Sequence, residues 1–178
     1  MTPNDSDPTE KTYRDIGEFM VTFSHVEACL RFALGLALDL TEEQIPVITS
    51  GFDFAHLVRV TKQLYQSRIP DSEEGRNAIT YIASECNALN DTRNHVAHGL
   101  WTVDPSGVQS SHISRQSLKE NVKFTAPDEL PAQTEKAKAL VTLFTVLFLV
   151  EAGREFFKRP DVRKAWEDFK KFLTPASD

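Results

Sequence analysis

The stretch "ITYIASECNALNDTRNHVAHG", residues 79–99, decides the fold because a helical apolar pattern runs through it and then stops. Its apolar residues recur at spacings of three and four, which predicts one buried face of an α-helix. These residues are Ile79, Ile82, Cys86 and Leu89. Gly99 predicts the end of the helix, because glycine readily adopts the left-handed conformation that terminates helices. We therefore predict a helix that begins near Asp71 or Ser72, which both suit an N-cap, and stops at Gly99.

Helical periodicity predicts two further helices before this stretch. An apolar stripe predicts a first helix over about residues 11–40. The polar residues 1–10 before it are expected to form a disordered tail. A second amphipathic pattern predicts a helix over about residues 53–66, and Pro70 ends that segment because proline disrupts a helix.

After Gly99 the periodicity changes from helical to alternating. The sequence "LWTVDPSGVQSSHIS", residues 100–114, places apolar residues around an Asp-Pro-Ser-Gly run whose residue types suit a type I turn. We predict a small β-hairpin in an insert over residues 99–126. Helix then returns over about residues 127–157, and Pro160 opens a last helix.

The length of 178 residues and the hydrophobic content of 40% fit a single globular domain. With the elements above, they predict an all-α fold, a bundle of four to five helices with a small β-hairpin insert, in one domain over residues 11–174. Cys29 and Cys86 lie within helical apolar patterns, which indicates reduced core residues and no disulfide.

The termini and apolar runs predict where the protein resides. The N-terminal sequence lacks the basic and apolar regions of a signal peptide. The longest apolar run, Ala139 to Val150, is shorter than the roughly 20 residues that cross a bilayer. We expect a cytoplasmic protein with no membrane association. The sequence has no Gly-rich phosphate loop, and we expect no cofactor.

The formal net charge of −6 argues against broad electrostatic capture of nucleic acid, because such binding needs Lys and Arg to neutralise phosphates. A polyanion would have to bind a local basic patch. Two groups of residues are candidates, and the alternative for both is an ordinary solvated surface. They are His112, Arg115, Lys119 and Lys123, or Arg154, Lys158, Arg159, Arg163 and Lys164.

Arg93 interrupts the apolar stripe with which this section opened. It follows Cys86 and Leu89 at the helical spacing, where an aliphatic side chain is expected. A guanidinium is almost never fully buried without a partner, because removing a charge from water costs several kcal/mol. Glu27 interrupts the apolar stripe of the first predicted helix in the same way, so we expect Glu27 to contact Arg93. The alternative is a buried ion pair that only fixes the register of the two helices.

Two histidines stand near the end of the same helix. His98 is five positions after Arg93, about 140° around an ideal helix, whereas Asn94 and His98 are four apart and share a face. At the helix end, His98 is expected to project into solvent. Asp91, His95 and His98 also have the spacing of a three-ligand metal face, but this pattern is more often a polar helix surface, and we expect no metal.

Together, "RNHVAHG", residues 93–99, resembles the signature of the HEPN superfamily (higher eukaryotes and prokaryotes nucleotide-binding). In that signature an arginine, followed by a polar residue, and a nearby histidine close a long helix. The resemblance extends to the acid within "FSHVEACL" of the first predicted helix and to the apolar helix after the motif, so it covers about residues 11–157. It implies a homodimer in which two motifs face each other. In active members it implies metal-independent cleavage of RNA, in toxins or in defence against phage.

The resemblance also implies roles for individual residues. His98 suits proton transfer because an imidazole titrates near neutrality, and Arg93 suits the phosphate because a guanidinium can bind two oxygens. Asn94 can orient the substrate or the histidine, and Glu27 can hold Arg93 in place. Further candidates for substrate binding are His95, His112, Arg115 and Lys119.

Leu100 departs from one branch of the family. In toxins whose partner is a small nucleotidyltransferase, a tyrosine often occupies this position and is adenylylated, so regulation by that modification is not expected here. An antitoxin or a nucleotidyltransferase stays a candidate partner. The insert after the motif either lines a substrate groove or only decorates the bundle, and we favour decoration. The alternative function is a non-catalytic module of HEPN type that binds a nucleotide, RNA or a partner protein.

Overall fold

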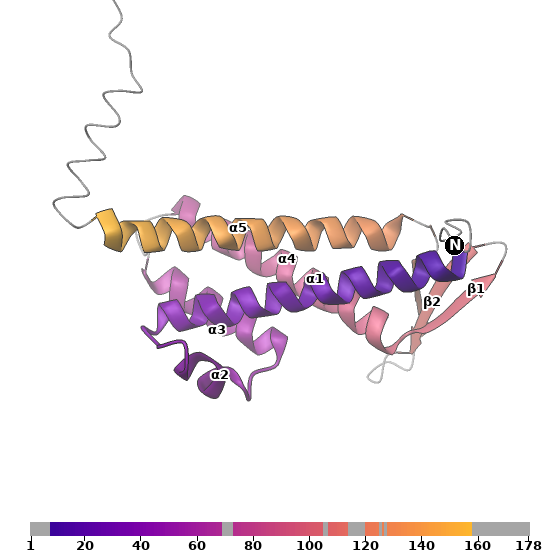
Figure 1. The fold of residues 1–178 in the computed structure, drawn as a ribbon, viewed down its shortest axis with the longest axis horizontal. Coiled ribbons are helices and arrows are strands. Elements are labelled where there is room, and N and C mark those ends of the chain that lie inside the picture. Colours follow the sequence, from indigo (N-terminus) through magenta and orange to yellow (C-terminus); the bar gives the residue numbers. More distant parts are fainter. Residues whose placement is uncertain are drawn as a thin grey trace, which may run out of the picture. The chain divides into compact units, whose positions relative to one another are not determined.

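The computed structural model describes residues 8–68, 73–104, 107–113, 120–124, 126 and 128–157. These residues contain five helices and a three-stranded antiparallel sheet that follows the fourth helix, which confirms the predicted fold class (Figure 1). The elements are α1 (Pro8–Ala37), α2 (Gln44–Thr49), α3 (Phe54–Arg68), α4 (Glu73–His98), β1 (Leu100–Asp104), β2 (Gly107–Ile113), β3 (Glu120–Lys123) and α5 (Glu129–Phe157).

The chain divides into two compact units between Val141 and Thr142. The first unit holds α1 to α4, the sheet and the start of α5, and the second holds the rest of α5. The single domain expected over residues 11–174 stays a prediction. The helix expected from Pro160 lies outside the described residues.

The four long helices lie close to the predicted positions, with two differences at the ends of α1. Helix α1 begins at Pro8, so the expectation of a disordered tail is wrong for residues 8–10, while residues 1–7 lie outside the described part. At its other end α1 stops at Ala37, before the predicted Leu40. Asp39 adopts a left-handed conformation with φ 54°, and the Leu40 amide donates to the Gly35 carbonyl at 3.0 Å. This is a Schellman ending, which closes the helix.

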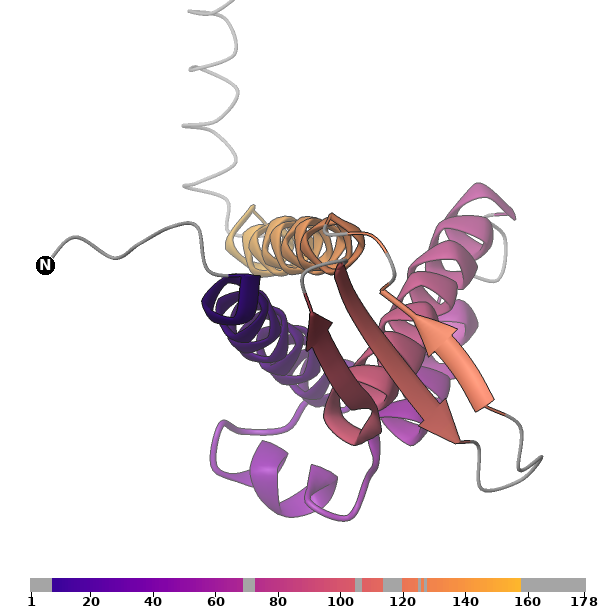
Figure 2. The same ribbon diagram turned by 90° about the vertical axis from the view of Figure 1, so that its right-hand side faces the viewer.

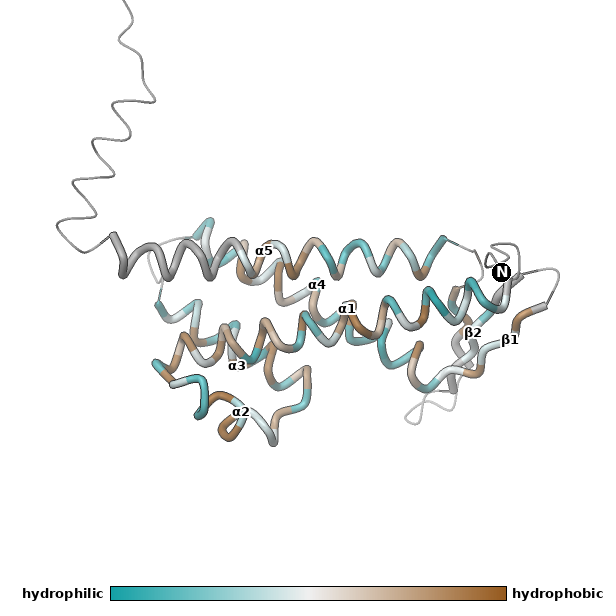
Figure 3. Tube along the Cα trace, viewed as in Figure 1, coloured by the Kyte–Doolittle hydropathy of each residue, from teal (hydrophilic) through white to brown (hydrophobic). Residues whose placement is uncertain are grey.

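Three helices of the first unit bury the apolar stripes that the sequence predicts. Figure 3 shows apolar residues recurring along α1, α3 and α4. The Phe23 and Phe54 rings of α1 and α3 lie 4.6 Å apart, and Phe19 and Leu57 are fully buried. Each such side chain contributes about 1.5–3 kcal/mol relative to an exposed one. Buried members of the stripes are Phe19, Phe23, Val26, Leu30 and Leu34 in α1, Phe54, Leu57 and Val58 in α3, and Ala83, Cys86, Leu89 and Val96 in α4.

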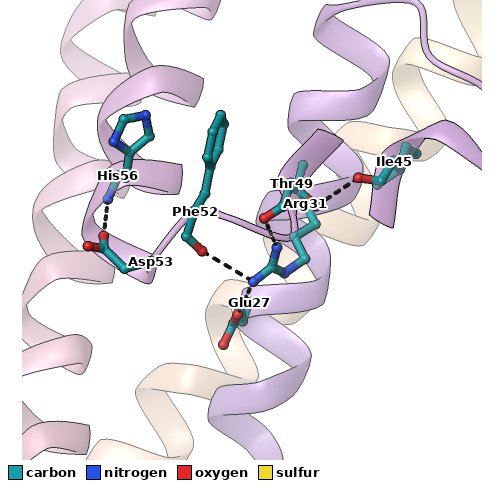
Figure 4. Close-up of polar contacts among 7 residues, drawn as sticks. All are labelled: Glu27, Arg31, Ile45, Thr49, Phe52, Asp53 and His56. Atoms are coloured by element: carbon teal, nitrogen blue, oxygen red, sulfur yellow. Dashed lines mark hydrogen bonds and ion pairs between the residues drawn. The ribbon is translucent and has the colours of Figure 1, made fainter. Parts of the chain in front are cut away.

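The short helix α2 was not predicted, and a glycine gives it room against α1. A Cβ atom at Gly35 would overlap the Ile45 side chain, so any other residue there requires Ile45 to move. Arg31 of α1 then holds the end of α2, because its guanidinium donates to the Thr49 carbonyl at 2.5 Å (Figure 4). The Thr49 hydroxyl in turn donates to the Ile45 carbonyl at 2.8 Å.

Asp53 begins α3. Its Oδ1 accepts from the His56 amide at 2.7 Å, and its carbonyl accepts from the Leu57 amide at 3.0 Å (Figure 4). A side-chain acceptor of this kind satisfies one of the unpaired amides at a helix start. The start of α3 is therefore fixed beside the Arg31 contacts.

The predicted hairpin is confirmed as β1 and β2, and a third strand extends it into a sheet of order β1-β2-β3 (Figure 2). Leu100 pairs with Ser111, and Ser110 of the central strand pairs with both Trp101 and Lys123. The predicted turn residues Pro105 and Ser106 lie outside the described part of the chain.

The first turns of α5 run beside α1 within the first unit (Figures 1 and 2). The Lys138 ammonium lies 2.6 Å from a carboxylate oxygen of Glu18 and 2.8 Å from one of Glu135. Buried residues recur at helical spacing in these turns. They are Leu130, Thr134, Ala137 and Leu140.

Helix α1 is long and apolar for a helix of this fold. Its residues Thr9–Ala37 are long and apolar enough to cross a membrane by length and composition, and 44% of their most apolar 18-residue window is buried inside the protein. Core helices of soluble proteins pass the same test. The cytoplasmic location stays a prediction.

Candidate functional site

Helix α4 ends in the segment that carries the predicted site. Arg93 and Asn94 are half-buried, and His98, the last residue of the helix, is exposed as expected. The prediction that Arg93 interrupts a buried apolar stripe of α4 is confirmed, because Leu89 and Val96 on either side of it are buried. A charged residue therefore stands in line with a buried apolar face.

The Arg93 guanidinium contacts an aromatic ring and an amide. Its central carbon lies 5.4 Å from the centroid of the Phe23 ring, and its Nη1 donates to Asn94 Oδ1 at 3.0 Å. Because Phe23 also contacts Phe54, Arg93 stands where α1, α3 and α4 meet. An arginine over an aromatic face gains about 0.5–2 kcal/mol from the cation–π attraction. This arrangement holds the guanidinium while leaving part of it open to solvent.

The predicted contact between Glu27 and Arg93 is absent from the described residues. Glu27 Oε1 instead accepts from Nη2 of Arg31, at 2.5 Å (Figure 4). Residues four apart on one helix face each other, so Arg31 reaches this carboxylate without help from another helix. Arg31 also donates to the Thr49 carbonyl, which places Glu27 in the anchoring of α2. No contact among the described residues therefore supports the expectation that Glu27 holds Arg93 in place.

His95 is buried, with 7% of its surface exposed. That burial argues against the predicted role of its side chain in substrate binding, and it separates His95 from the exposed Asp91 and His98. Over residues that the structure describes, no group of three or more His, Cys, Asp and Glu side chains is placed to hold a metal ion.

The predicted insert also binds the C-terminal end of α4, a contact that the sequence did not predict. The Gly99 amide donates to the His95 carbonyl at 2.8 Å, and Trp101 Nε1 donates to the Val96 carbonyl at 3.1 Å. These bonds satisfy two carbonyls that a helix end leaves unpaired. The Trp101 ring stacks on Phe124, with centroids 5.5 Å apart and planes 9° apart. The insert therefore fixes the helical turn that presents His98.

Glycine is required where α4 passes into β1. A Cβ atom at Gly99 would overlap both the Ser110 hydroxyl oxygen and the His95 carbonyl. Ser110 is fully buried, and its hydroxyl has no hydrogen-bond partner among the residues that the structure describes. The close approach of β2 to the end of α4 thus explains Gly99 better than a helix stop alone does.

The other candidate substrate-binding residues are only partly described. His112 lies in β2 opposite Asn121, whereas Arg115 and Lys119 lie outside the described residues. Lys123 of β3 is half-buried opposite Ser110. Of the second predicted basic group, Arg154 lies in α5 and the remaining members lie outside the described part.

The two cysteines are free thiols, as the sequence predicts. Burial and, to a smaller extent, the nearby Glu85 carboxylate together raise the pKa of the Cys86 thiol to about 12. Burial also raises the pKa of the half-buried Cys29. Neither thiol is therefore ionised near neutral pH, which argues against a nucleophilic cysteine.

The site that results consists of Arg93 over Phe23, Asn94 beside it, and an exposed His98 on a helix end clamped by Trp101. Comparison of the chain with protein-family models, with curated proteins and with solved structures finds no match.

Proposed function

We propose that the protein is a metal-independent endoribonuclease of HEPN type that acts as a homodimer. The observation that carries the proposal is an exposed histidine on a fixed helix end, His98, within one helical segment of a half-buried arginine, Arg93. The resemblance of "RNHVAHG" to the HEPN signature supplies the reaction class.

Arg93 suits the binding of the scissile phosphate. Its charge does not change with pH in the physiological range, and its planar donors can bind two phosphate oxygens at once. Asn94 accepts from one of its nitrogens, so the orientation of the guanidinium is restricted before a substrate arrives. Such pre-orientation lowers the entropy cost of binding the transition state.

His98 suits the proton transfers of RNA cleavage. A base takes the proton of the ribose 2′-hydroxyl, whose oxygen then attacks phosphorus while the bond from phosphorus to the 5′-oxygen breaks. An acid gives a proton to the departing 5′-oxygen, which leaves a cyclic phosphate on one fragment and a 5′-hydroxyl on the other. An imidazole can serve as either acid or base near neutral pH. Two chains would supply one histidine for each transfer, which is why we propose a homodimer.

The biological setting that we propose is that of a toxin or of a phage-defence effector in the cytoplasm. A ribonuclease with this role needs control, so we propose an antitoxin or nucleotidyltransferase as a partner. Leu100 is 73% exposed immediately after Gly99 and has no hydroxyl, so control by adenylylation at this position is not part of the proposal.

One observation favours the alternative, a non-catalytic module that binds a nucleotide, RNA or a partner protein. Arg93 contacts Phe23 and Asn94, and no contact with His98 is present among the described residues. A binding module would need Arg93 for phosphate and would not need His98.

The test compares the purified wild type with His98→Ala on a mixed RNA substrate, with and without EDTA. We expect the wild type to cleave in EDTA and the variant to lose about 100- to 10,000-fold in rate, with little change in melting temperature because His98 is exposed. Equal rates for the two proteins, or no cleavage by either, would replace the ribonuclease with the binding module. Light scattering at micromolar concentration tests the homodimer, and a monomer would contradict it.

A further inference from the structure

We propose that the exposed side of α1 is an interface for a second copy of the chain, in which the two α1 helices pack antiparallel. We name this surface the α1 outer face. Its central residues are Val21, His25, Ala28 and Phe32, and Arg14 and Asp39 mark its two ends. The inference goes beyond the proposed function, because it concerns a surface that the candidate site does not use.

Helix α1 has apolar residues on two opposite sides, and the protein buries one of them. Phe19 and Phe23 lie in the core, and Val21 is two positions from each, about 200° around the helix. Val21 is 58% exposed and Phe32 is 39% exposed, and His25 between them is exposed as well. A surface helix usually presents polar residues on the side away from the core, so an apolar outer side indicates an interaction surface.

The centre of the outer face carries no charged residue. Between Glu18 and Asp39 the sequence contains only Glu27 and Arg31 as charged residues, and these two pair with each other beside α2. At the end of the face, the Lys138 ammonium lies 2.6 Å from a carboxylate oxygen of Glu18. The centres of protein interfaces are depleted in charge, whereas nucleic acids and membrane surfaces are bound by helices rich in Lys and Arg. The composition therefore favours a protein partner.

The spacing of the outer face is that of a seam between two helices. Val21, His25, Ala28 and Phe32 follow one another at intervals of four, three and four residues, the pattern with which paired helices pack. Ala28 is small and exposed, which lets a second helix approach closely. The Ser24 hydroxyl at the edge of the seam donates to the Val21 carbonyl at 2.7 Å, so a partner can cover it without loss of that hydrogen bond.

The outer face is complementary to itself when two copies run antiparallel, and this identifies the partner as a second copy. The register that places Val21 against Phe32 of the second copy also places Arg14 against Asp39 of the second copy. Two-fold symmetry repeats both pairs, so opposite charges meet at each end of an apolar centre. A parallel arrangement would instead place Arg14 against Arg14, and like charges repel.

The first experiment measures molecular mass by light scattering over a series of protein concentrations for wild type, Val21→Glu and Tyr81→Glu. Tyr81 is 64% exposed on α4, so Tyr81→Glu adds the same charge at an exposed apolar residue outside the outer face. We expect Val21→Glu to have half the mass of wild type at high concentration. Its association through the outer face should weaken about 100-fold or more, because the interface would bury a carboxylate without a partner. Tyr81→Glu should associate as wild type does, and circular dichroism melting verifies that each variant folds.

The second experiment tests the antiparallel register with engineered cysteines and oxidised glutathione as the oxidant. The double variant Val21→Cys/Phe32→Cys should form a covalent dimer, which denaturing electrophoresis without reductant detects. The two new thiols cannot bond within one chain, because eleven positions separate them, about 16 Å along the helix. Val21→Cys and Phe32→Cys alone are the controls and retain the native Cys29 and Cys86. Neither single variant should cross-link above the level of wild type.

Several outcomes overturn the inference. They are a monomeric wild type at every concentration, equal masses of wild type and Val21→Glu, an equal loss of mass in Tyr81→Glu, and cross-linking of Val21→Cys alone, which a parallel pair would give. A monomeric wild type that binds phosphatidylcholine vesicles through Val21 would assign the outer face to a membrane and would also overturn it.

RNA cleavage keeps this inference apart from the proposed function. Phe23, which contacts Arg93, lies on the opposite side of α1 from Val21, so we expect Val21→Glu to cleave RNA at the wild-type rate. Association through the outer face by a protein that does not cleave RNA would retain this inference and reject the ribonuclease. Cleavage by a protein whose mass does not depend on Val21 would do the reverse.

Discussion

The guanidinium carbon of Arg93 lies 5.4 Å from the centre of the Phe23 ring, so a cation on α4 rests on the aromatic core of α1. This contact explains how a charged residue occupies an apolar stripe without an acidic partner. The ring attracts the cation, and the half-exposed position lets water solvate the rest of the guanidinium.

Replacement of Arg93 separates stability from function. Arg93→Met places an unbranched apolar side chain in the stripe, so we expect the free energy of unfolding to stay within about 1 kcal/mol of wild type or to rise. Cleavage and RNA binding should fall, because the phosphate ligand is gone. Arg93→Lys keeps the charge and serves as control, and it should recover only part of the activity since a lysine cannot bind two oxygens in one plane. Urea unfolding measures the stability of each variant, and RNA degradation rates measure its activity. Full activity of Arg93→Met would contradict the proposed role of Arg93 in binding phosphate.

Glu27 should couple to Arg31 and not to Arg93. Its carboxylate contacts Arg31 at 2.5 Å, and its side chain is 31% exposed, so Glu27→Ala should cost about 1 kcal/mol or less. Loss of a buried partner of Arg93 would instead cost about 3–5 kcal/mol. Double-mutant cycles of Glu27 with each arginine give the two coupling energies. A large coupling between Glu27 and Arg93 would restore the contact that the sequence predicts.

Trp101 should stabilise the end of α4 through its indole N–H. Trp101→Phe retains an aromatic ring against Phe124 but loses the bond to the Val96 carbonyl, which should lower the free energy of unfolding by about 0.5–1.5 kcal/mol. Gly99→Ala should cost more than Trp101→Phe, because one of the atoms that a Cβ would meet is a backbone oxygen. Tyr81→Phe, at a side chain that is 64% exposed, is the control. Equal stability of Trp101→Phe and wild type in urea unfolding would show that the clamp is unimportant.

Cys86 makes stability depend on pH in the alkaline range. The pKa of its thiol in the folded protein is raised to about 12 from an ordinary value of 9.0, so the unfolded chain loses this proton first as the pH rises. The contribution of the Cys86 thiol to the free energy of unfolding is complete below about pH 9. It is lost progressively between about pH 9 and 12. Cys86→Ala should show a weaker decline in melting temperature over this interval than wild type. A parallel decline in both proteins would assign the pH dependence to other groups.

The sequence predicted the helical elements well where their periodicity was long. In α4 the residues Ile82, Cys86 and Leu89 predict a buried face, and Arg93 stands out because it breaks that pattern. The exposure of His98 also follows from sequence, since a side chain at a helix end projects beyond the bundle. Helix α2 was missed because six residues are too few for a periodic pattern to be recognised.

Only the tertiary structure decided which groups surround Arg93 and His98. Periodicity fixes the face of a helix on which a residue lies, which is why Arg93 could be placed on the core side from sequence alone. It does not choose among competing partners. Glu27 pairs with Arg31 because the two share one helix and Arg31 also reaches the Thr49 carbonyl, a contact made by a distant segment. His95 is buried in the last turns of α4, which the sheet insert contacts through Trp101. The strand pairing of the insert and the Trp101 contact join residues that only folding brings together.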